Sequence, residues 1–290
     1  MCRSPSTTTE RIEGWGRWQR CNSCGLQFVD PLGFNGNLGK LFDDAYNGHE
    51  TSNNLQDFAY RLSERRAFLE NPSLWFWTPA YHDVLDWLDV NCSDHGTILD
   101  LGCGLGYFLR SLRGKGFKPV GVDIAETAVR LNRNDGFPVW HGSIDQVPRE
   151  WANPEAIVSF FMFHHTPNPL ETIQTIRAKW PSASLAIAVY GPSNYDPSRS
   201  NPPRTLIRWN STALGSLLET AGYEPELREY SSSGTEAGFL RPLGGLRKRI
   251  NLKESGIRAA KLMEIEMLPR LTRPFVRAKY VLLGLGRPLN

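Results

Sequence analysis

Short apolar runs alternate with amphipathic segments between residues 97 and 188. The apolar runs predict strands at Thr97–Leu101, Pro119–Asp123, Val139–Trp140, Ala156–Phe160 and Ser184–Ala188. The segments between them predict helices at Tyr107–Lys115, Glu126–Asn134 and Pro169–Lys179, with an irregular short helix near Asp145–Trp151. Apolar strands that alternate with helices are typical of a parallel sheet covered on both faces.

The region before this alternation has a weaker pattern. A helical periodicity runs from Phe58 to Leu88 and is interrupted at Asn71-Pro72. Residues 1–20 show no clear periodicity, so we expect them to be poorly ordered.

After the sheet, the segment SLLETAGYEPEL predicts a helix that is ended by Gly222. Ser211 or Thr212 is the expected N-cap of that helix, because a hydroxyl can accept from the first backbone N–H groups. The remaining expected elements are a strand near Glu226–Tyr230, an amphipathic helix at Leu252–Leu268, and a final strand or second short helix at Phe275–Leu283.

Composition places the chain among ordinary globular proteins. It has 290 residues, of which 40% are hydrophobic and 22% charged, and a net charge of +3. There is no apolar run of about 18 residues and no apolar stretch near the start, so neither a spanning helix nor a secretory signal is expected. The 5 cysteines are too few and too scattered for a disulfide framework. We therefore expect a cytoplasmic protein.

Basic residues are concentrated in the last fifty positions. Residues 241–290 contain 12 Lys or Arg against 3 Glu, which gives +9 and leaves −6 for residues 1–240. A basic amphipathic segment is suited to peripheral contact with an anionic membrane, or to nucleic acid, or it simply packs on the domain as a solvated helix. We expect an N-terminal region at 1–55, a main domain at 56–240, and a basic extension at 241–290 that includes the last strand if one forms.

The run from Asp100 to Gly106, DLGCGLG, carries the first functional signal. Its glycines follow an apolar strand and precede a helix, and this layout lets a nucleotide approach the backbone closely. The spacing is G-x-G-x-G, which differs from the G-x-G-x-x-G of dinucleotide-binding folds. Asp123 ends the second strand, where one carboxylate can accept from two ribose hydroxyls. Asp100 disfavours a pyrophosphate and favours an amine-bearing ligand, so S-adenosylmethionine fits both acids.

With these residues, the chain resembles class I S-adenosylmethionine-dependent methyltransferases from about Gly96 to Tyr230. The resemblance implies an α/β, Rossmann-like, mainly parallel seven-stranded sheet with helices on both faces. It also implies the roles of individual residues. The methionine end of the cofactor would be held by Asp100, Gly102, Cys103, Gly104 and Gly106. Asp123 with Ile124 would bind the ribose, and Ser143 and Ile144 would border the adenine. Phe160 and Phe161 would close over the cofactor.

The resemblance also limits the acceptor. Methyltransferases of nucleic-acid bases usually carry an Asn/Asp-Pro-Pro-aromatic turn after the fourth strand, and residues 159–162 read Ser-Phe-Phe-Met instead. We therefore expect no DNA-base substrate. The FHHTPNP run is similar to the loop of small-molecule and sugar methyltransferases. His165, or second His164, is the candidate general base on an acceptor hydroxyl; the alternative is a histidine that only ties the loop to a helix.

The acceptor end is expected to lie beside the 191–209 loop. The resemblance places Trp209 near the mouth of the site, together with Tyr46 and Trp77. Arg204 and Arg208 are candidates to bind a carboxylate or phosphate of the acceptor.

The segment RCNSCGLQFVDP carries a second motif. Cys21 and Cys24 have the spacing of half a tetrahedral zinc site, with Gly25 permitting a tight turn. The segment resembles the N-terminal hook of a methyltransferase subgroup that has C-x-x-C-G followed by an Asp/Asn-Pro step. Members of that subgroup usually have a second C-x-x-C upstream, whereas only Cys2 precedes the hook here. Zinc bound by Cys21 and Cys24 and a degenerate hook without metal are both left open.

Two other readings compete with a methyltransferase. One is a nicotinamide-dependent oxidoreductase, against which the G-x-G-x-G spacing counts. The other is a methyltransferase-fold binding protein without catalytic activity, in which cofactor binding survives. Of the three, an O-methyltransferase acting on a small-molecule or sugar-like acceptor is our prediction.

Overall fold

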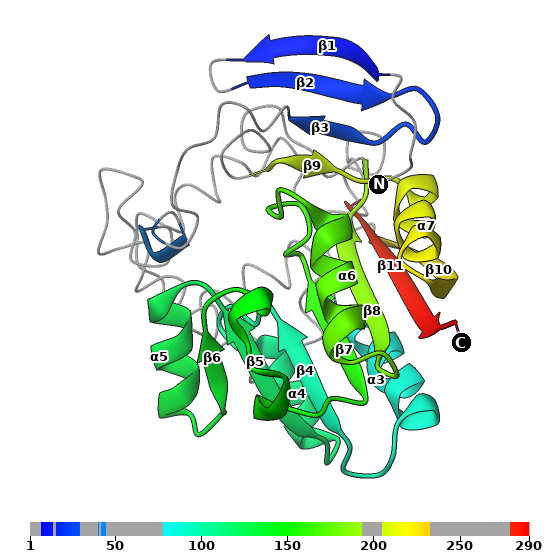
Figure 1. Ribbon diagram of the computed structural model, residues 1–290. Helices are drawn as coiled ribbons and strands as arrows, with labels where there is room; N and C mark the ends of the chain where they lie inside the picture. Colours follow the sequence, from blue (N-terminus) through cyan, green and yellow to red (C-terminus); the bar gives the residue numbers. More distant parts are fainter. Residues whose placement is uncertain are drawn as a thin grey trace, which may run out of the picture.

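A twisted seven-stranded sheet organises the structure (Figure 1). The computed structural model describes residues 7–13, 16–29, 40, 42–44, 78–192, 205–232 and 279–289. Across the sheet, the strands follow the order β10 (Tyr223–Ser232), β11 (Lys279–Pro288), β8 (Ser184–Tyr190), β7 (Ala156–Phe160), β4 (Thr97–Leu101), β5 (Lys118–Asp123) and β6 (Val139–His141). The run from β8 to β6 is parallel, whereas β11 is antiparallel to both of its neighbours.

Helices cover both faces of the sheet because its strands are apolar on both sides. The helices are α3 (Thr78–Asn91), α4 (Tyr107–Gly114), α5 (Glu126–Asn134), α6 (Pro169–Lys179) and α7 (Ser211–Thr220), with short 3₁₀ turns at Ile144–Gln146 and Arg149–Trp151. In β7, Ile157 packs in the cluster of α6 and α7, while Ala156 and Val158 pack in the cluster of α3 and α4. The predicted Rossmann-like fold, mainly parallel and covered on both faces, is confirmed.

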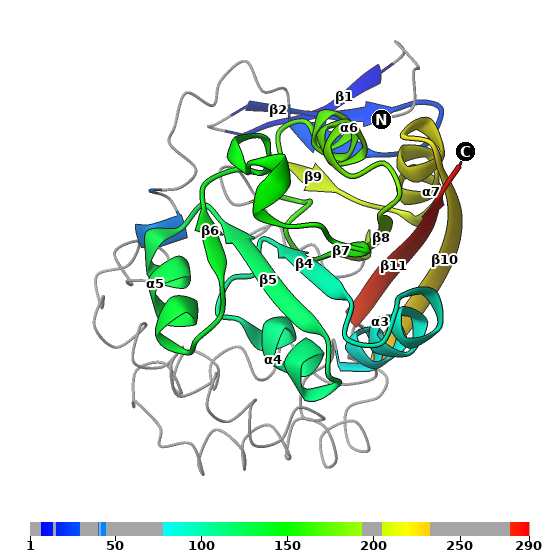
Figure 2. The same ribbon diagram turned by 60° about the horizontal axis from the view of Figure 1, so that its bottom comes forward.

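The direction in which successive strands are added to the sheet changes at β4. From β4 the chain proceeds through α4 to β5 and β6 on one side, and it then returns to β7 and β8 on the other side of β4 (Figure 2). Right-handed crossovers in opposite directions place α4 and α6 on opposite faces of the sheet. The carboxyl ends of β4 and β7 therefore form a topological switch point, where α/β sheets bind their ligands.

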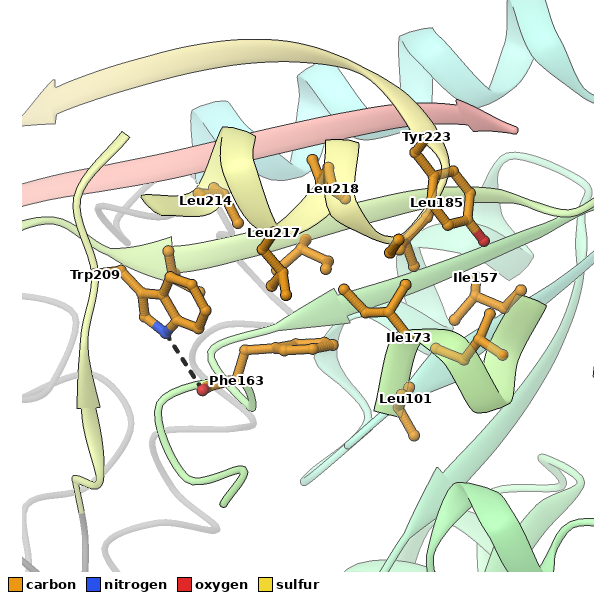
Figure 3. Close-up of a cluster of buried hydrophobic side chains, with 14 of the residues drawn as sticks. Leu101, Ile157, Phe163, Ile173, Leu185, Trp209, Leu214, Leu217, Leu218 and Tyr223 are labelled. Atoms are coloured by element: carbon orange, nitrogen blue, oxygen red, sulfur yellow. Dashed lines mark hydrogen bonds between the residues drawn. The ribbon is translucent and has the colours of Figure 1, made fainter. Parts of the chain in front are cut away.

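The largest buried cluster lies between α7, α6 and the sheet (Figure 3). Leu214, Leu217 and Leu218 of α7 are fully buried there. Gly284 of β11 lets α7 lie close to the sheet, since a Cβ at this position would be 2.8 Å from the side chain of Leu218. The indole of Trp209 donates to the carbonyl oxygen of Phe163 at 3.3 Å, which connects this core to the loop after β7.

A second sheet contains four strands, in the order β1 (Thr7–Glu13), β2 (Gly16–Cys21), β3 (Gln27–Val29) and β9 (Ile207–Arg208). The expectation that residues 1–20 are poorly ordered is wrong for the described part, because β1 and β2 form an antiparallel pair. The stabilising contact is long-range. Trp18 of β2 is buried, and the guanidinium carbon of Arg208 lies 3.9 Å from the centre of the Trp18 ring. The local sequence pattern does not predict this partner.

Other boundaries differ from the predictions. The alternative at Phe275–Leu283 resolves to a strand, β11, which pairs with β10 and β8 in the central sheet. The N-cap of α7 is Asn210 instead of Ser211 or Thr212, and its side chain accepts from the N–H of Ala213 at 2.8 Å. The expected helices at 58–77 and 252–268 lie outside the described residues. None of the described helices has the length and apolar character needed to span a bilayer.

We expect truncation of the α7 core to be costly. Leu217→Ala removes a fully buried side chain, so the free energy of unfolding should fall by about 2–5 kcal/mol. Leu289→Ala is the matched control, because Leu289 is 51% exposed, and it should change stability by less than about 0.5 kcal/mol. Urea denaturation measures both; equal effects of the two substitutions would contradict the placement of α7.

Candidate active site

The carboxyl ends of the parallel strands bring the predicted cofactor residues to one edge of the sheet. The strands end at Leu101, Asp123, His141, Phe160 and Tyr190. The glycine loop follows β4 directly, and its first N–H groups, from Gly102 and Cys103, donate to the carbonyl of Val122 on β5. The loop is thus anchored to the neighbouring strand before helix α4 begins.

Gly102 is required where the loops after β4 and β7 meet. Its φ is +74°, in the left-handed region that side chains rarely adopt, and a Cβ would lie 2.7 Å from the side chain of Met162. Cys103, next in the loop, is buried, and burial raises the pKa of its thiol well above the usual value. This cysteine is therefore a packing residue and not a reactive thiol.

Asp123 joins the glycine loop to the second strand and helix. Its Oδ2 accepts from the N–H of Gly104 at 2.8 Å, and its Oδ1 accepts from the N–H of Ala125 at 2.9 Å. The side chain is only 7% exposed. Burial raises the pKa of Asp123, and these two backbone hydrogen bonds oppose that rise. Each oxygen keeps a lone pair, so the carboxylate can still accept from two vicinal hydroxyls.

Asp100 is a buried acid for which the described part of the chain offers no ion-pair partner. It follows Ile98 by two residues on β4 and so faces the same side of the sheet, toward Tyr81 of α3. Burial, followed by the charge of Asp123, raises the pKa of Asp100 to about 8. Among the described residues, no basic side chain forms an ion pair with it. A buried carboxyl of this kind is suited to a ligand that brings its own positive charge.

The two phenylalanines at the end of β7 have ring centres 6.2 Å apart, and each has further aromatic partners of its own. Phe160 packs edge-on against Tyr81, with ring centres 4.4 Å apart, and contacts Phe108 at 4.5 Å. Phe161 instead stacks on Tyr190 at 4.5 Å. Phe161 has φ +60°, which is strained for a non-glycine residue, and its N–H donates to the carbonyl of Ala188 at 2.8 Å. Backbone strain of this kind tends to gather at functional sites.

The two histidines differ in their surroundings. His164 is 1% exposed, and its ring lies parallel to that of Tyr190, with centres 4.8 Å apart. Neither ring nitrogen has a hydrogen-bond partner in the described part of the chain. Burial and the neighbouring His165 lower the pKa of His164 well below 6.5, so the ring is neutral. The ring of His165 is partly exposed and contacts Phe42 edge-on at 4.9 Å.

The residues expected beside the adenine follow β6. Ser143 and Gln146 form a capping box on the 3₁₀ turn, in which the N–H of Ser143 donates to the Gln146 side chain at 3.0 Å. Ile144 is buried against the core, and the carbonyl of Ile124 accepts from a His141 ring nitrogen at 3.3 Å. These residues lie beside the tip of β5, where β6 pairs with Asp123.

The cysteine hook forms a tight turn at the end of β2. The N–H of Gly25, whose φ is +70°, donates to the carbonyl of Cys21 at 2.9 Å. Both Cys21 and Cys24 are buried and free of disulfides. Within the described ranges, no group of three or more His, Cys, Asp or Glu side chains is placed to hold a metal ion. The hook by itself supplies two thiol ligands.

The hook also supports the histidine loop. β3 pairs with β9, and the N–H groups of Leu206 and Ile207 both donate to the carbonyl of His164, at 2.8 and 3.2 Å. Asn210 donates to the carbonyl of Cys24 at 3.0 Å. The placement of His164 thus depends on a sheet formed largely by the N-terminal region.

One expectation for the acceptor end is corrected. Trp209 is buried in the core at 1% exposure and does not line a mouth. The guanidinium of Arg208 lies on the ring of Trp18, and its binding to an acceptor stays a prediction. Tyr46, Trp77 and Arg204 lie outside the described residues.

The resemblance to the hook subgroup indicated a short helix at Leu41-Phe42-Asp43, but sequence reasoning did not predict its contacts. The side chain of Asp43 accepts from the N–H of Thr127 at 2.9 Å, at the N-terminus of α5, whose own N-cap is Ala125. Its charge also raises the pKa of Asp123. Phe42 meanwhile contacts His165. The short helical segment thereby touches both the strand tip of Asp123 and the histidine loop, and a contact across 84 positions leaves no local signal in the sequence.

Comparison with known proteins decides the family. Residues 76–227 match the family described as "Methyltransferase domain", which is more than half of the chain. The chain belongs to this family. The predicted resemblance to class I S-adenosylmethionine-dependent methyltransferases is confirmed at this level, whereas the comparisons do not address the subgroup with a cysteine hook.

Relatives of this methyltransferase-family chain are distant. A ubiquinone biosynthesis O-methyltransferase from Aromatoleum aromaticum is 28% identical over 127 residues, which cover 38% of this chain and 54% of that protein. EEF1A lysine methyltransferase 2 from Danio rerio is 36% identical over 63 residues, covering 21% and 27%. The chain thus spans about half the length, or less, of the curated relatives it matches.

Solved structures agree on the fold. A chain from the complex containing the Haloferax volcanii Trm112 methyltransferase activator aligns with a TM-score of 0.52 at 19% identity, covering 81% of this chain and 98% of its own length. The MccD protein aligns with a TM-score of 0.50 at 14% identity, covering 72% and 98%. At these identities, the likeness concerns the fold alone.

The raised pKa of Asp100 predicts a pH-dependent stability. The folded-state pKa, about 8, lies above the unfolded value of about 3.9, so the folded state binds the proton more tightly. The contribution of Asp100 is therefore fully present below about pH 4 and is lost as pH rises toward 8. Asp100→Asn should raise the melting temperature of the ligand-free protein more at pH 8 than at pH 5, as followed by calorimetry.

Asp94→Asn is the control for that comparison, because Asp94 is exposed and its substitution should leave the pH dependence unchanged. The same shift with pH in wild type and in Asp100→Asn would show that Asp100 is not a buried acid.

Proposed function

We propose that the chain transfers a methyl group from S-adenosylmethionine to a hydroxyl of a small-molecule or sugar-like acceptor. The observation that carries the proposal is the Asp123 carboxylate, which is held by Gly104 of the glycine loop and Ala125 at the tip of β5. Such a carboxylate matches a ribose diol next to a loop that admits a close ligand. S-adenosylmethionine, when bound, supplies an electrophilic methyl group on a sulfonium.

The residues of the site fit this cofactor in charge as well as shape. Asp100 is buried, has no cation partner among the described residues and lies near the aromatic ring of Tyr81. The amino group and the sulfonium of the cofactor are both positive, and aromatic faces attract cations. A pyrophosphate would instead place negative charge beside this acid, which disfavours the nicotinamide alternative.

The acceptor is proposed to meet His164, Phe161 and Tyr190 beyond the end of β7. His164 is a neutral imidazole whose ring nitrogens have no partner among the described residues, so it is able to accept a hydrogen bond from an acceptor hydroxyl and take its proton. His165, first in the sequence-based order, packs against Phe42 and comes second here. The ubiquinone biosynthesis relatives, whose name denotes O-methylation, support an oxygen acceptor.

The hook is proposed to relate the chain to the methyltransferase subgroup with an N-terminal C-x-x-C-G. Its support is the tight turn that holds two buried thiols and is closed by the N–H of Gly25, directly after Cys24. If zinc binds, Cys21 and Cys24 are the thiolates that would hold it, and the effect would be to fix the turn that supports β9. Zinc content measured on purified protein tests this part separately from methyl transfer.

Cofactor binding is the first test of the function. Titration calorimetry with S-adenosylmethionine, S-adenosylhomocysteine and NADH should give micromolar affinity for the first two and none for NADH. Asp123→Asn should weaken the first two by about tenfold or more, since a hydrogen bond to a charged group contributes about 1.5–3 kcal/mol.

Asp94→Asn, an exposed change of the same type, should leave those affinities within about twofold of wild type. Binding of NADH in place of the sulfur nucleosides would support the oxidoreductase reading. Binding without turnover on any acceptor would support a binding protein without catalytic activity.

Turnover on an acceptor panel tests His164. S-Adenosylhomocysteine formation should be measured with phenols and sugar nucleotides as candidate acceptors. His164→Gln should lower kcat by about 10²–10⁴-fold, the usual contribution of a general base, while cofactor affinity stays unchanged. His82→Gln, an exposed histidine on α3, is the control. A larger loss in His165→Gln than in His164→Gln would reverse the assignment.

A further inference from the structure

Asn132, near the end of α5, reaches across to the glycine loop. Its Nδ2 donates to the carbonyl of Gly104 at 2.7 Å and to the carbonyl of Ala128 at 2.9 Å, and the side chain is 0% exposed. The Ala128 contact stays within α5, whereas the Gly104 contact connects α5 to a loop 28 positions earlier. A buried side chain therefore holds the loop that is proposed to receive the cofactor.

The orientation of this amide follows from its neighbours. Two carbonyl oxygens lie within hydrogen-bond distance of one end, and carbonyls only accept, so that end must be the NH₂ group. Both of its protons are used. The other end, Oδ1, is buried and has no partner in the described part of the chain.

The unpaired oxygen argues against a purely structural role for Asn132. A buried acceptor without a partner lowers stability and offsets part of what the two donated hydrogen bonds contribute. Gly106 matches the oxygen closely, because a Cβ at that position would lie only 1.9 Å from Oδ1. The polar residue and the glycine are thus complementary in shape around the loop, and stability alone does not account for the amide.

Gly104 is held from both of its backbone groups. Its N–H donates to Asp123 Oδ2 at 2.8 Å, and its C=O accepts from Asn132 at 2.7 Å. One residue of the loop is therefore clamped between the strand tip of β5 and the helix that follows it. Movement of Gly104 in either direction disturbs the carboxylate that is proposed to bind the ribose.

We propose that Asn132 is a positioning residue for the cofactor. It does not touch the ligand; it fixes the Gly104 peptide groups, and through them the Asp123 carboxylate, in the binding geometry before the ligand arrives. Without the amide, the loop must be ordered on binding, and affinity falls by that ordering cost. The inference rests on the proposed cofactor and concerns affinity, not the chemistry at the acceptor.

Asn132→Leu tests the proposal, because leucine keeps the branched shape and removes both donors. Titration calorimetry should show affinity for S-adenosylmethionine and S-adenosylhomocysteine reduced about fivefold or more, as expected for one lost hydrogen bond. The melting temperature of the ligand-free protein should change by only a few degrees, because loss of the donor to Gly104 and removal of the unpaired oxygen act in opposite directions. Asn134→Leu, an exposed asparagine on the same helix, should leave both affinities within about twofold of wild type.

A second readout separates positioning from packing. In hydrogen exchange of the ligand-free protein, the Gly104 amide should exchange at least severalfold faster in Asn132→Leu than in wild type or Asn134→Leu. In a double-mutant cycle with Asp123→Asn, the losses in affinity should be less than additive, because both side chains act on the same peptide.

The outcomes distinguish the two proposals. Wild type that binds both sulfur nucleosides, with Asn132→Leu within twofold of it, overturns the role of Asn132 alone. Wild type that binds neither overturns the proposed function, and the positioning role falls with it. If Asn132→Leu does not fold, Asn132→Ala, which removes the same donors without adding apolar volume, is judged by the same criteria.

Discussion

The hydrogen bonds on the Asp123 carboxylate are the interactions on which the site depends. One oxygen holds Gly104 of the first βα unit, and the other holds Ala125 in the turn between β5 and α5 of the second. The Gly104 bond fixes the two units relative to each other, while the Ala125 bond orients the carboxylate; both are to backbone N–H groups and so do not depend on the side chains of Gly104 or Ala125. A buried carboxylate is costly unless it is well hydrogen-bonded, so the same contacts that shape the loop also keep the acid ionisable.

Asp100, the neighbouring acid, has a different environment from Asp123. No basic side chain in the described ranges pairs with it, and burial raises its pKa to about 8. Burial raises the pKa of Asp123 as well, but there the backbone hydrogen bonds oppose the rise. This asymmetry suits a ligand with a neutral diol at one end and a positive amino-acid tail at the other, and it makes the ligand-free site less stable than it would be with apolar residues.

The acceptor side depends on a separate structural device. His164 is placed by hydrogen bonds from Leu206 and Ile207, and β9 is paired with β3 of the N-terminal sheet. The hook at Cys21–Cys24 connects β2 to β3 in that sheet. The N-terminal sheet thus supports the loop after β7, whereas the glycine loop is held by β5 and α5. The proposed acceptor side and the proposed cofactor side are therefore positioned by different parts of the structure.

The sequence by itself determined the strand–helix alternation, the glycine loop and the two acids, because short apolar runs and backbone-demanding turns leave local signals. It did not determine the environment of each side chain. Trp209 looked like a mouth residue and is core, the described part of residues 1–20 looked irregular and forms strands, and the contacts of Asn132 and Asp43 were not predicted. Only the tertiary structure decided these, since each depends on a partner tens of residues away. Local propensity fixes what an element is, whereas burial and hydrogen-bond partners, which decide what a residue does, arise from long-range packing.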